Sequence, residues 1–294
     1  MKNIIVVTGG AGFIGSNLIS LLIKKTKKKI ISIDNYTTGK KSNHIIHKRV
    51  TYIRSDTNNF NQLFKNKINK IESVFHFGEF SRITQSFIKK DECFSSNLKG
   101  SFEVINFCLK NKIRIIYSAT SASLGNNQDD QHLSPYAYTK SNNLNLLINL
   151  NRWFGLKYEI IYFYNVYGPK QLMNSDMSAV IGIFENQFLN NKSLTVVSPG
   201  SQTRNFTHVS DTVLVCYNAW KKNKNCHYSI SSKKSYSIIH IAKFFSRKII
   251  YLKPRLGERF ESKLLRSIRN IKISNLYGKI DIKDYIANFV KNNS

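Results

Sequence analysis

Residues 4–18 read Ile4-Ile5-Val6-Val7-Thr8-Gly9-Gly10-Ala11-Gly12-Phe13-Ile14-Gly15-Ser16-Asn17-Leu18, and this stretch carries the strongest structural signal in the chain. Its first four residues form an unbroken apolar run, which is typical of a strand buried on both faces. Gly10, Gly12 and Gly15 follow with the spacing of a dinucleotide-binding turn, where glycine permits a tight turn and close approach of the backbone to a pyrophosphate. A helix-competent apolar segment comes next, and its N-terminus would offer free N–H groups to that pyrophosphate.

A second apolar run, residues 30–33, ends in Asp34, which follows Gly15 by 19 residues. In dinucleotide-binding folds a carboxylate at about this distance accepts hydrogen bonds from ribose hydroxyls. A glycine-rich turn without a ligand would not account for Asp34. We therefore predict a nucleotide site in which Asp34 favours a ribose diol over a ribose 2′-phosphate.

The chain has 294 residues and a formal net charge of +28. This length can bury a sizeable core, as one large domain or two coupled ones. The charge has two interpretations, a nucleic-acid surface or a Lys- and Asn-rich composition spread over solvated faces. We favour the second, because the lysines are scattered and form one dense run, at residues 24–29. In either case a positive field would attract an anionic substrate.

The sequence contains no apolar stretch of 18 residues and no segment that resembles a secretion signal. We therefore expect a cytoplasmic protein without membrane insertion. The four cysteines have no C-x-x-C spacing, so neither a disulfide framework nor a metal site is indicated.

Strand-like runs at residues 50–53, 73–77, 113–117 and 158–164 alternate with helical patterns at 86–110 and 136–151. This alternation predicts an α/β fold, a Rossmann-type doubly wound parallel sheet. After Pro169 the order is less regular, with expected helices at 179–190, 211–221, 238–245 and 281–291 and strands at 194–197 and 228–230. We expect a nucleotide-binding domain over 1–168 and a smaller, partly interleaved substrate lobe over 169–294, from which segments near 205–232 return to the first domain.

A candidate catalytic set lies around the fifth predicted strand. Tyr136 and Lys140 are four residues apart and share one face of the helix that Ser134-Pro135 starts. A lysine ammonium favours the phenolate form of a neighbouring tyrosine, which could then take a proton from substrate. Thr120 follows the carboxyl end of the fifth strand, the edge at which open α/β sheets bind ligands, and its hydroxyl could hydrogen-bond a substrate oxygen.

These features resemble the extended short-chain dehydrogenases/reductases, in the nucleotide-sugar epimerase/dehydratase family, most of all its UDP-glucose 4-epimerases. The resemblance covers nearly the whole chain. The motifs that carry it are the glycine motif 8–15, Asp34-Asn35, Asp56, His76-Phe77-Gly78-Glu79, Asn97 before Gly100-Ser101, and the segments 164–169, 203–211 and 254–258.

The resemblance implies NAD as the cofactor and a nucleotide-diphosphate sugar, with a UDP-sugar favoured, as the substrate. Its cofactor contacts are Gly9, Gly12, Phe13, Ile14, Gly15, Asp34, Asn35, Asp56, Asn97, Tyr136 and Lys140. Its catalytic residues are Thr120, Tyr136 and Lys140, and its substrate contacts are Glu79, Ser86, Asn165, Arg204 and Arg255. The two arginines would hold the phosphates, because a guanidinium forms planar charge-assisted hydrogen bonds.

The chain departs from the family pattern at several positions near this site. Ser121-Ala122 stands where the family's 4,6-dehydratases have an Asp-Glu pair, and Glu79, Phe80 and Arg82 stand where small residues are usual. We expect Glu79 to form an ion pair with Arg82 or a hydrogen bond to a sugar hydroxyl. His76 and His208 are expected to be structural.

We therefore expect an NAD-dependent nucleotide-sugar 4-epimerase. Tyr136 would take the O4 proton while C4 gives a hydride to NAD, and the 4-keto sugar would take the hydride back on its other face. The alternatives are a 4,6-dehydratase or reductase on a similar substrate, or a non-catalytic NAD- or RNA-binding relative. The intact catalytic set argues against the non-catalytic alternative.

The resemblance also implies a homodimer, in which the helices at 83–110 and 136–151 pair with those of a second copy. We expect their apolar contact face to consist of Phe102, Ile105, Phe107, Leu146 and Leu150.

Overall fold

A sheet of nine strands forms the centre of the computed structural model, which describes residues 2–125, 131–254 and 264–293. The strands lie in the order β14 (Ser267–Ile268), β15 (Ile271–Tyr277), β11 (His227–Ser231), β6 (Tyr158–Phe163), β5 (Arg114–Thr120), β4 (Ile71–His76), β1 (Ile4–Thr8), β2 (Lys29–Asp34) and β3 (Val50–Arg54). All neighbouring strands are parallel except β14, which is antiparallel to β15. The predicted Rossmann-type α/β fold is thus confirmed.

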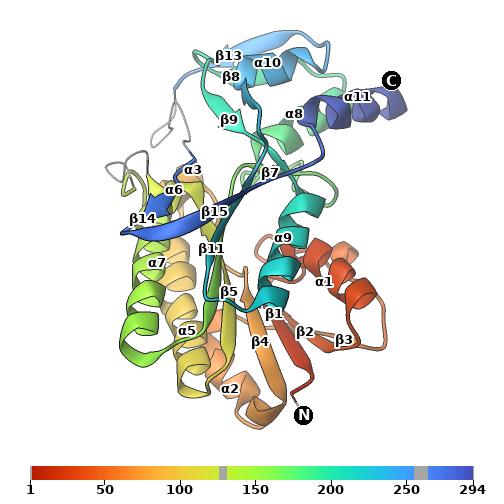
Figure 1. Ribbon diagram of the computed structural model, residues 1–294. Coiled ribbons are helices and arrows are strands. Elements are labelled where there is room, and N and C mark those ends of the chain that lie inside the picture. The colour runs from red at the N-terminus through yellow and green to blue at the C-terminus, as the bar shows by residue number, and fades with distance from the viewer. Residues whose placement is uncertain (1, 126–130, 255–263, 294) are drawn as a thin grey trace.

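Helices cover both faces of this sheet (Figure 1). On one face lie α1 (Phe13–Lys25) and α9 (Val209–Lys222), and on the other lie α2 (Phe60–Phe64), α5 (Ser101–Lys110) and α7 (Pro135–Phe154). Because each face meets a helical layer, the inner strands are buried on both sides, and Ile5, Val6 and Val7 of β1 are 0% exposed. The turn to α1 therefore begins at a strand that is held in the core of the sheet.

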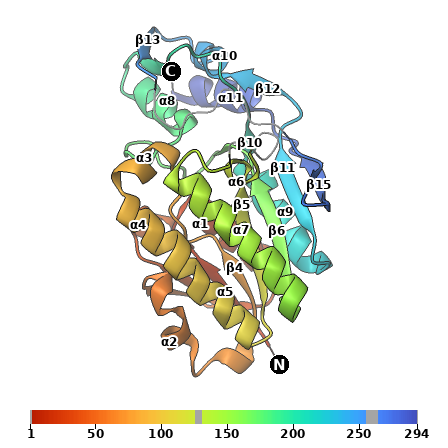
Figure 2. The ribbon, with the colours of Figure 1, turned by 90° about the vertical axis from the view of Figure 1, so that its left-hand side faces the viewer.

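A smaller lobe stands above the carboxyl ends of the strands (Figures 1 and 2). Its elements are α8 (Val180–Leu189), β8 (Leu194–Val197), β9 (Thr203–Asn205), β12 (Ser235–Ser237), α10 (Ile238–Lys243), β13 (Ile249–Leu252) and α11 (Ile282–Asn293). They share a separate apolar core around Phe184, Phe188 and Phe245. The short strands β7 (Val166–Tyr167) and β10 (Thr207–His208) pair where the chain passes between the lobes.

The structure differs from the sequence-based expectations in detail. The helix expected over 86–110 is divided into α3 (Ile83–Ile88), α4 (Lys90–Phe94), a π-helical segment (Ser95–Gly100) and α5. The segments near 205–232 lie where they were expected, because α9 packs on α1 and β11 lies beside β6. Strand β15, which no pattern indicated, extends the sheet beyond β11.

The apolar face expected for a dimer is wrong at three of its five positions. Ile105, Phe107 and Leu150 are 0%, 1% and 9% exposed, because they pack into the core between the helices and the sheet. Leu146 is partly buried against the same core, whereas Phe102 is 50% exposed. Any dimer contact on α5 would therefore use Phe102 and its exposed neighbours.

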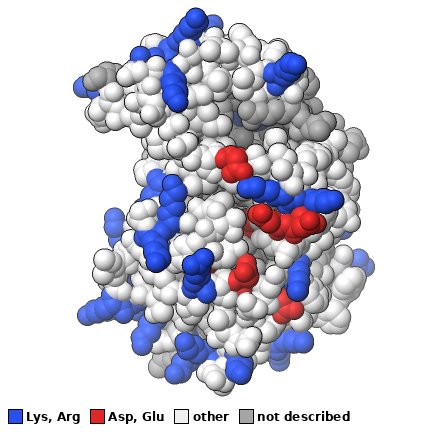
Figure 3. Space-filling model, turned by 180° about the vertical axis from the view of Figure 1, so that it is seen from behind, with Lys and Arg blue, Asp and Glu red and all other residues white. Residues whose placement is uncertain are grey.

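Lysine and arginine side chains are spread over both lobes and are separated by uncharged surface on the face seen in Figure 3. This distribution differs from the continuous basic stripe that is typical of nucleic-acid-binding surfaces. None of the described helices combines the length and apolar composition that crossing a bilayer requires.

Candidate functional site

The turn between β1 and α1 is built as an anion-binding turn. Gly9 has φ +70°, and a Cβ at Gly15 would lie 2.1 Å from the carbonyl oxygen of Gly9, so both positions require glycine. Helix α1 begins after Gly12, and no side chain caps it. The first N–H groups of the helix and its positive dipole end therefore remain available to a phosphate group.

The second part of the predicted cofactor site lies at the ends of β2 and β3. The Asp34 carboxylate accepts hydrogen bonds from the N–H groups of Ala11 (3.0 Å) and Tyr36 (2.8 Å), which fix it against the glycine turn. Burial raises the pKa of Asp34, while these N–H groups act in the opposite direction. Asn35 donates a hydrogen bond to Asp56 (2.8 Å). The turn and the three polar side chains fit a dinucleotide.

A cavity of about 1070 Å³ extends from this turn to the start of α7, and residues of the smaller lobe form part of its lining. Fourteen of the residues expected from the sequence line it, namely Gly9, Gly12, Phe13, Ile14, Gly15, Asp34, Asn35, Asp56, Glu79, Thr120, Tyr136, Lys140, Asn165 and Arg204. This volume lies at the upper end of the range for cavities that bind one small ligand, so the cavity has room for a cofactor and a substrate together.

The three catalytic candidates, Thr120, Tyr136 and Lys140, line the same cavity. Thr120 ends β5, and its Oγ1 accepts a hydrogen bond from the N–H of Ala122 (3.3 Å). Tyr136 and Lys140 stand on the first turns of α7, where the Ser134 side chain caps the helix by accepting from the N–H of Ala137 (3.1 Å). The predicted start signal of this helix is confirmed, and it directs the phenol and the ammonium to one side of the cavity.

Glu79 is the ion-pair partner of Lys140. The expected ion pair between Glu79 and Arg82 is therefore wrong, because packing brings Glu79 under α7, whereas Arg82 donates hydrogen bonds to the carbonyl oxygens of Met177 and Ser81. Glu79 lines the cavity, although its side chain is only 2% exposed.

Two expected contacts, Asn97 and Ser86, are buried behind the cavity and do not line it. Asn97 accepts from the N–H of Phe80 (2.6 Å) and donates to the carbonyl oxygen of Phe80 (3.1 Å). Ser86 accepts a hydrogen bond from the N–H of Tyr136 (3.2 Å). Both side chains therefore position the loop after β4 and the start of α7, rather than a ligand.

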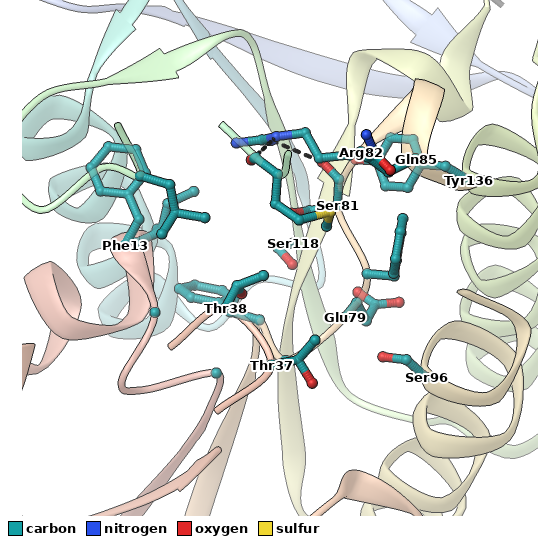
Figure 4. Close-up of a pocket in the computed structure, with 18 of the residues that line it drawn as sticks. Phe13, Thr37, Thr38, Glu79, Ser81, Arg82, Gln85, Ser96, Ser118 and Tyr136 are labelled. Carbon is teal, nitrogen blue, oxygen red and sulfur yellow. Dashed lines mark hydrogen bonds between the residues drawn. The ribbon is translucent and has the colours of Figure 1, made fainter. Parts of the chain in front are cut away.

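The substrate side of the cavity receives residues from both lobes. Asn165 donates a hydrogen bond to the carbonyl oxygen of Asn205 (3.1 Å), and the neighbouring Arg204 lines the cavity. The Arg82 side chain extends into the space between Phe13 and Tyr136 (Figure 4). The remaining expected contact, Arg255, lies outside the described residues.

Sequence reasoning missed three residues around Lys140. The ammonium donates to the carbonyl oxygen of Ser118 and lies 4.6 Å from the ring centroid of Tyr117, and Asn143 donates to Glu79 (3.0 Å). Asn143 follows Lys140 by three residues on the same helix face, which is the one signal that could have indicated it.

His76 is structural, as expected. Its ring lies between the hydroxyls of Thr8 (2.8 Å) and Ser101 (2.9 Å) and is fully buried. Burial lowers its pKa to about 4, so the ring is neutral at neutral pH. Within the described residues, no group of three or more His, Cys, Asp or Glu side chains could hold a metal ion.

Comparison with known proteins agrees with this geometry. Over 309 aligned residues the chain is 29% identical to a Methanocaldococcus jannaschii protein named "putative UDP-glucose 4-epimerase", covering 99% of both chains. It is 31% identical over 231 residues to UDP-glucuronic acid decarboxylase 6 of Arabidopsis thaliana, covering 71% of this chain and 63% of the relative.

Among solved structures, the UDP-N-acetylglucosamine 4-epimerase of Methanobrevibacter ruminantium, in complex with UDP-N-acetylmuramic acid, matches with a TM-score of 0.84 and 28% identity. The match covers 99% of this chain and 98% of that one. The model of the NAD dependent epimerase/dehydratase family matches residues 5–231. With the glycine turn, the Asp34 carboxylate and the Tyr136–Lys140 pair in place, the chain belongs to the NAD dependent epimerase/dehydratase family, and NAD is its cofactor.

Proposed function

We propose that this enzyme is a nucleotide-sugar 4-epimerase with a UDP-sugar as its favoured substrate. One observation carries the proposal: Thr120, Tyr136 and Lys140 line one cavity, while the two positions after Thr120 are Ser121 and Ala122. The proposal is supported by two proteins that are named as 4-epimerases and that align with nearly the full chain.

In this mechanism the residues of the chain remove and return the proton of the sugar O4 hydroxyl. Bound NAD supplies the acceptor, and later the donor, of the hydride at C4. Tyr136, as the phenolate, takes the O4 proton and returns it after the 4-keto sugar has turned over in the cavity. The Thr120 hydroxyl accepts from a backbone N–H, so its proton is available to hydrogen-bond O4. The Lys140 ammonium favours the phenolate of Tyr136.

The absence of carboxyl groups at two positions separates this proposal from a 4,6-dehydratase. Removal of water across C5 and C6 requires a base for the C5 proton and an acid for the leaving hydroxyl. Ser121 and Ala122 supply neither group. We therefore propose reversible inversion at C4 without net loss of water and without net consumption of NAD.

The test is incubation of the purified enzyme with UDP-, dTDP- and GDP-sugars, followed by NMR and mass spectrometry. We expect an epimer of unchanged mass, and no product with the Tyr136→Phe variant. A product lighter by one water would make the enzyme a dehydratase. Loss of carbon dioxide from a uronic-acid substrate would make it a decarboxylase, and either result would refute the proposal.

A further inference from the structure

Glu79 is a buried carboxylate beside the catalytic residues to which the epimerase mechanism assigns no task. Its side chain is 2% exposed, and that of its partner Lys140 is 5% exposed. Its Oε1 accepts hydrogen bonds from Ser101 (2.9 Å), Tyr117 (2.9 Å) and Asn143 (3.0 Å), and its Oε2 accepts from Lys140. These donors belong to α5, β5 and α7, so the carboxylate joins three elements at the inner wall of the site.

The hydrogen bonds leave Glu79 unable to exchange a proton with a substrate. Four donors contact this carboxylate, three at Oε1 and Lys140 at Oε2, and almost none of the side chain is exposed to the cavity. Burial by itself would raise the pKa of Glu79, but Lys140, His76 and the hydrogen bonds outweigh burial and hold that pKa below its ordinary value. Glu79 therefore stays ionised, and any effect on the reaction passes through Lys140.

Glu79 determines where the Lys140 ammonium points. Of the three N–H groups of the ammonium, one donates to Glu79 and one to the carbonyl oxygen of Ser118. The Tyr117 hydroxyl lies 3.4 Å away, which is too long for a strong third bond. Since Ser118 and Tyr117 belong to β5, these contacts fix the ammonium against that strand.

Tyr136 stands one helical turn before Lys140 on α7, so a charge paired with the ammonium would also act on the phenol. A cation favours the phenolate, and an anion paired with that cation opposes the effect. The other titratable groups facing this pair are Arg82, His76, Cys93 and Tyr117.

Three of those four groups are neutral at neutral pH. Burial lowers the pKa of His76 to about 4, raises that of the Cys93 thiol to about 11 and raises that of Tyr117 well above its ordinary value. Arg82 is a cation beside Tyr136. Among these described groups, Glu79 supplies the negative charge.

We propose that Glu79 is a positioning residue, which holds the Lys140 ammonium in place and sets the pH range in which Tyr136 acts as the base. This inference rests on the proposed function, and it assigns Glu79 no contact with the sugar.

The first test measures Tyr136 directly. Tyrosine labelled with ¹³C at Cζ is titrated by NMR in the NAD-bound enzyme without substrate, and the Tyr136→Phe variant identifies the signal. With Glu79→Gln, the titration of Tyr136 should move to lower pH by about one unit, because the charge that opposes Lys140 is gone. Glu72→Gln is the matched control, since Glu72 forms an ion pair with Lys28 at the surface, and it should not move the signal. An unchanged titration in Glu79→Gln overturns the proposal.

The second test uses turnover and separates the two proposals. The acidic limb of the kcat/KM profile should move by the same amount as the NMR titration in Glu79→Gln. If the wild-type enzyme epimerises none of the sugars, the proposed function fails, while the NMR titration still decides the role of Glu79. If Glu79→Gln does not fold, Lys140→Met is compared with the double variant Glu79→Gln/Lys140→Met, which contains no unpaired buried charge. Tyr136 should titrate at lower pH in the double variant, and equal titrations would overturn the inference.

Discussion

The buried ring of His227 should make the larger lobe lose stability in acid. His227 lies in β11 between the hydroxyls of Tyr158 (3.1 Å) and Tyr162 (2.8 Å) and is 0% exposed. Burial lowers its pKa from the ordinary 6.5 to about 4. Because the folded pKa lies below the unfolded one, the unfolded chain binds the proton first. The stabilisation is present above about pH 6.5 and is lost as the pH falls toward 4.

The magnitude follows from these two pKa values. A fall from 6.5 to about 4 is worth about 3 kcal/mol in full, of which about 2 kcal/mol is lost between pH 7.5 and pH 5. The variant His227→Asn keeps a polar side chain but does not titrate. Its free energy of unfolding should therefore depend on pH less steeply than that of the wild type, by about 2 kcal/mol over this interval.

The assay is urea unfolding at both pH values, followed by the fluorescence of Trp220, which is 6% exposed and donates a hydrogen bond to Ser73 of the sheet (2.9 Å). The matched control is Ser229→Ala, which changes a buried, hydrogen-bonded and non-titrating side chain of the same strand. It should destabilise the lobe equally at both pH values. If His227→Asn retains the pH dependence of the wild type, the ring is not held neutral by burial and the reasoning is refuted.

Three further predictions concern the cofactor, the base and the assembly. Asp34 should make NAD bind more tightly than NADP in calorimetry, because its carboxylate would repel a 2′-phosphate; equal or tighter NADP binding would contradict this. Tyr136→Phe should lower turnover by several orders of magnitude with nucleotide-sugar binding close to wild type, and Lys140→Met should also weaken NAD binding; near-normal turnover of Tyr136→Phe would identify another base. Light scattering at micromolar concentration should show a homodimer that Phe102→Glu dissociates, since Phe102 is half exposed on α5; a monomeric wild-type enzyme would count against it.

Features that depend on neighbouring residues could be predicted from the sequence. The apolar run 4–7, the glycines after it and the apolar segment that follows specify strand, turn and helix within 22 residues, from Ile4 to Lys25. Ser134-Pro135 likewise specified where α7 begins, and hence that Tyr136 and Lys140 share a face. These features are local because backbone hydrogen bonds and helix caps join residues a few positions apart.

Contacts between residues far apart in the sequence could not be predicted in this way, because they depend on how the helices and strands pack. Glu79 pairs with Lys140, 61 positions away, rather than with nearby Arg82, because α7 packs over the loop after β4. Strand β15 has alternating polarity and lies half-exposed near the sheet edge, so no continuous apolar run marks it. Ile105 and Phe107 are apolar residues of the helix expected over 86–110, but the packing of α5 on the sheet places them in the core. The sequence shows that an apolar residue or a buried carboxylate requires a partner, but the packing of the helices and strands determines which residue that partner is.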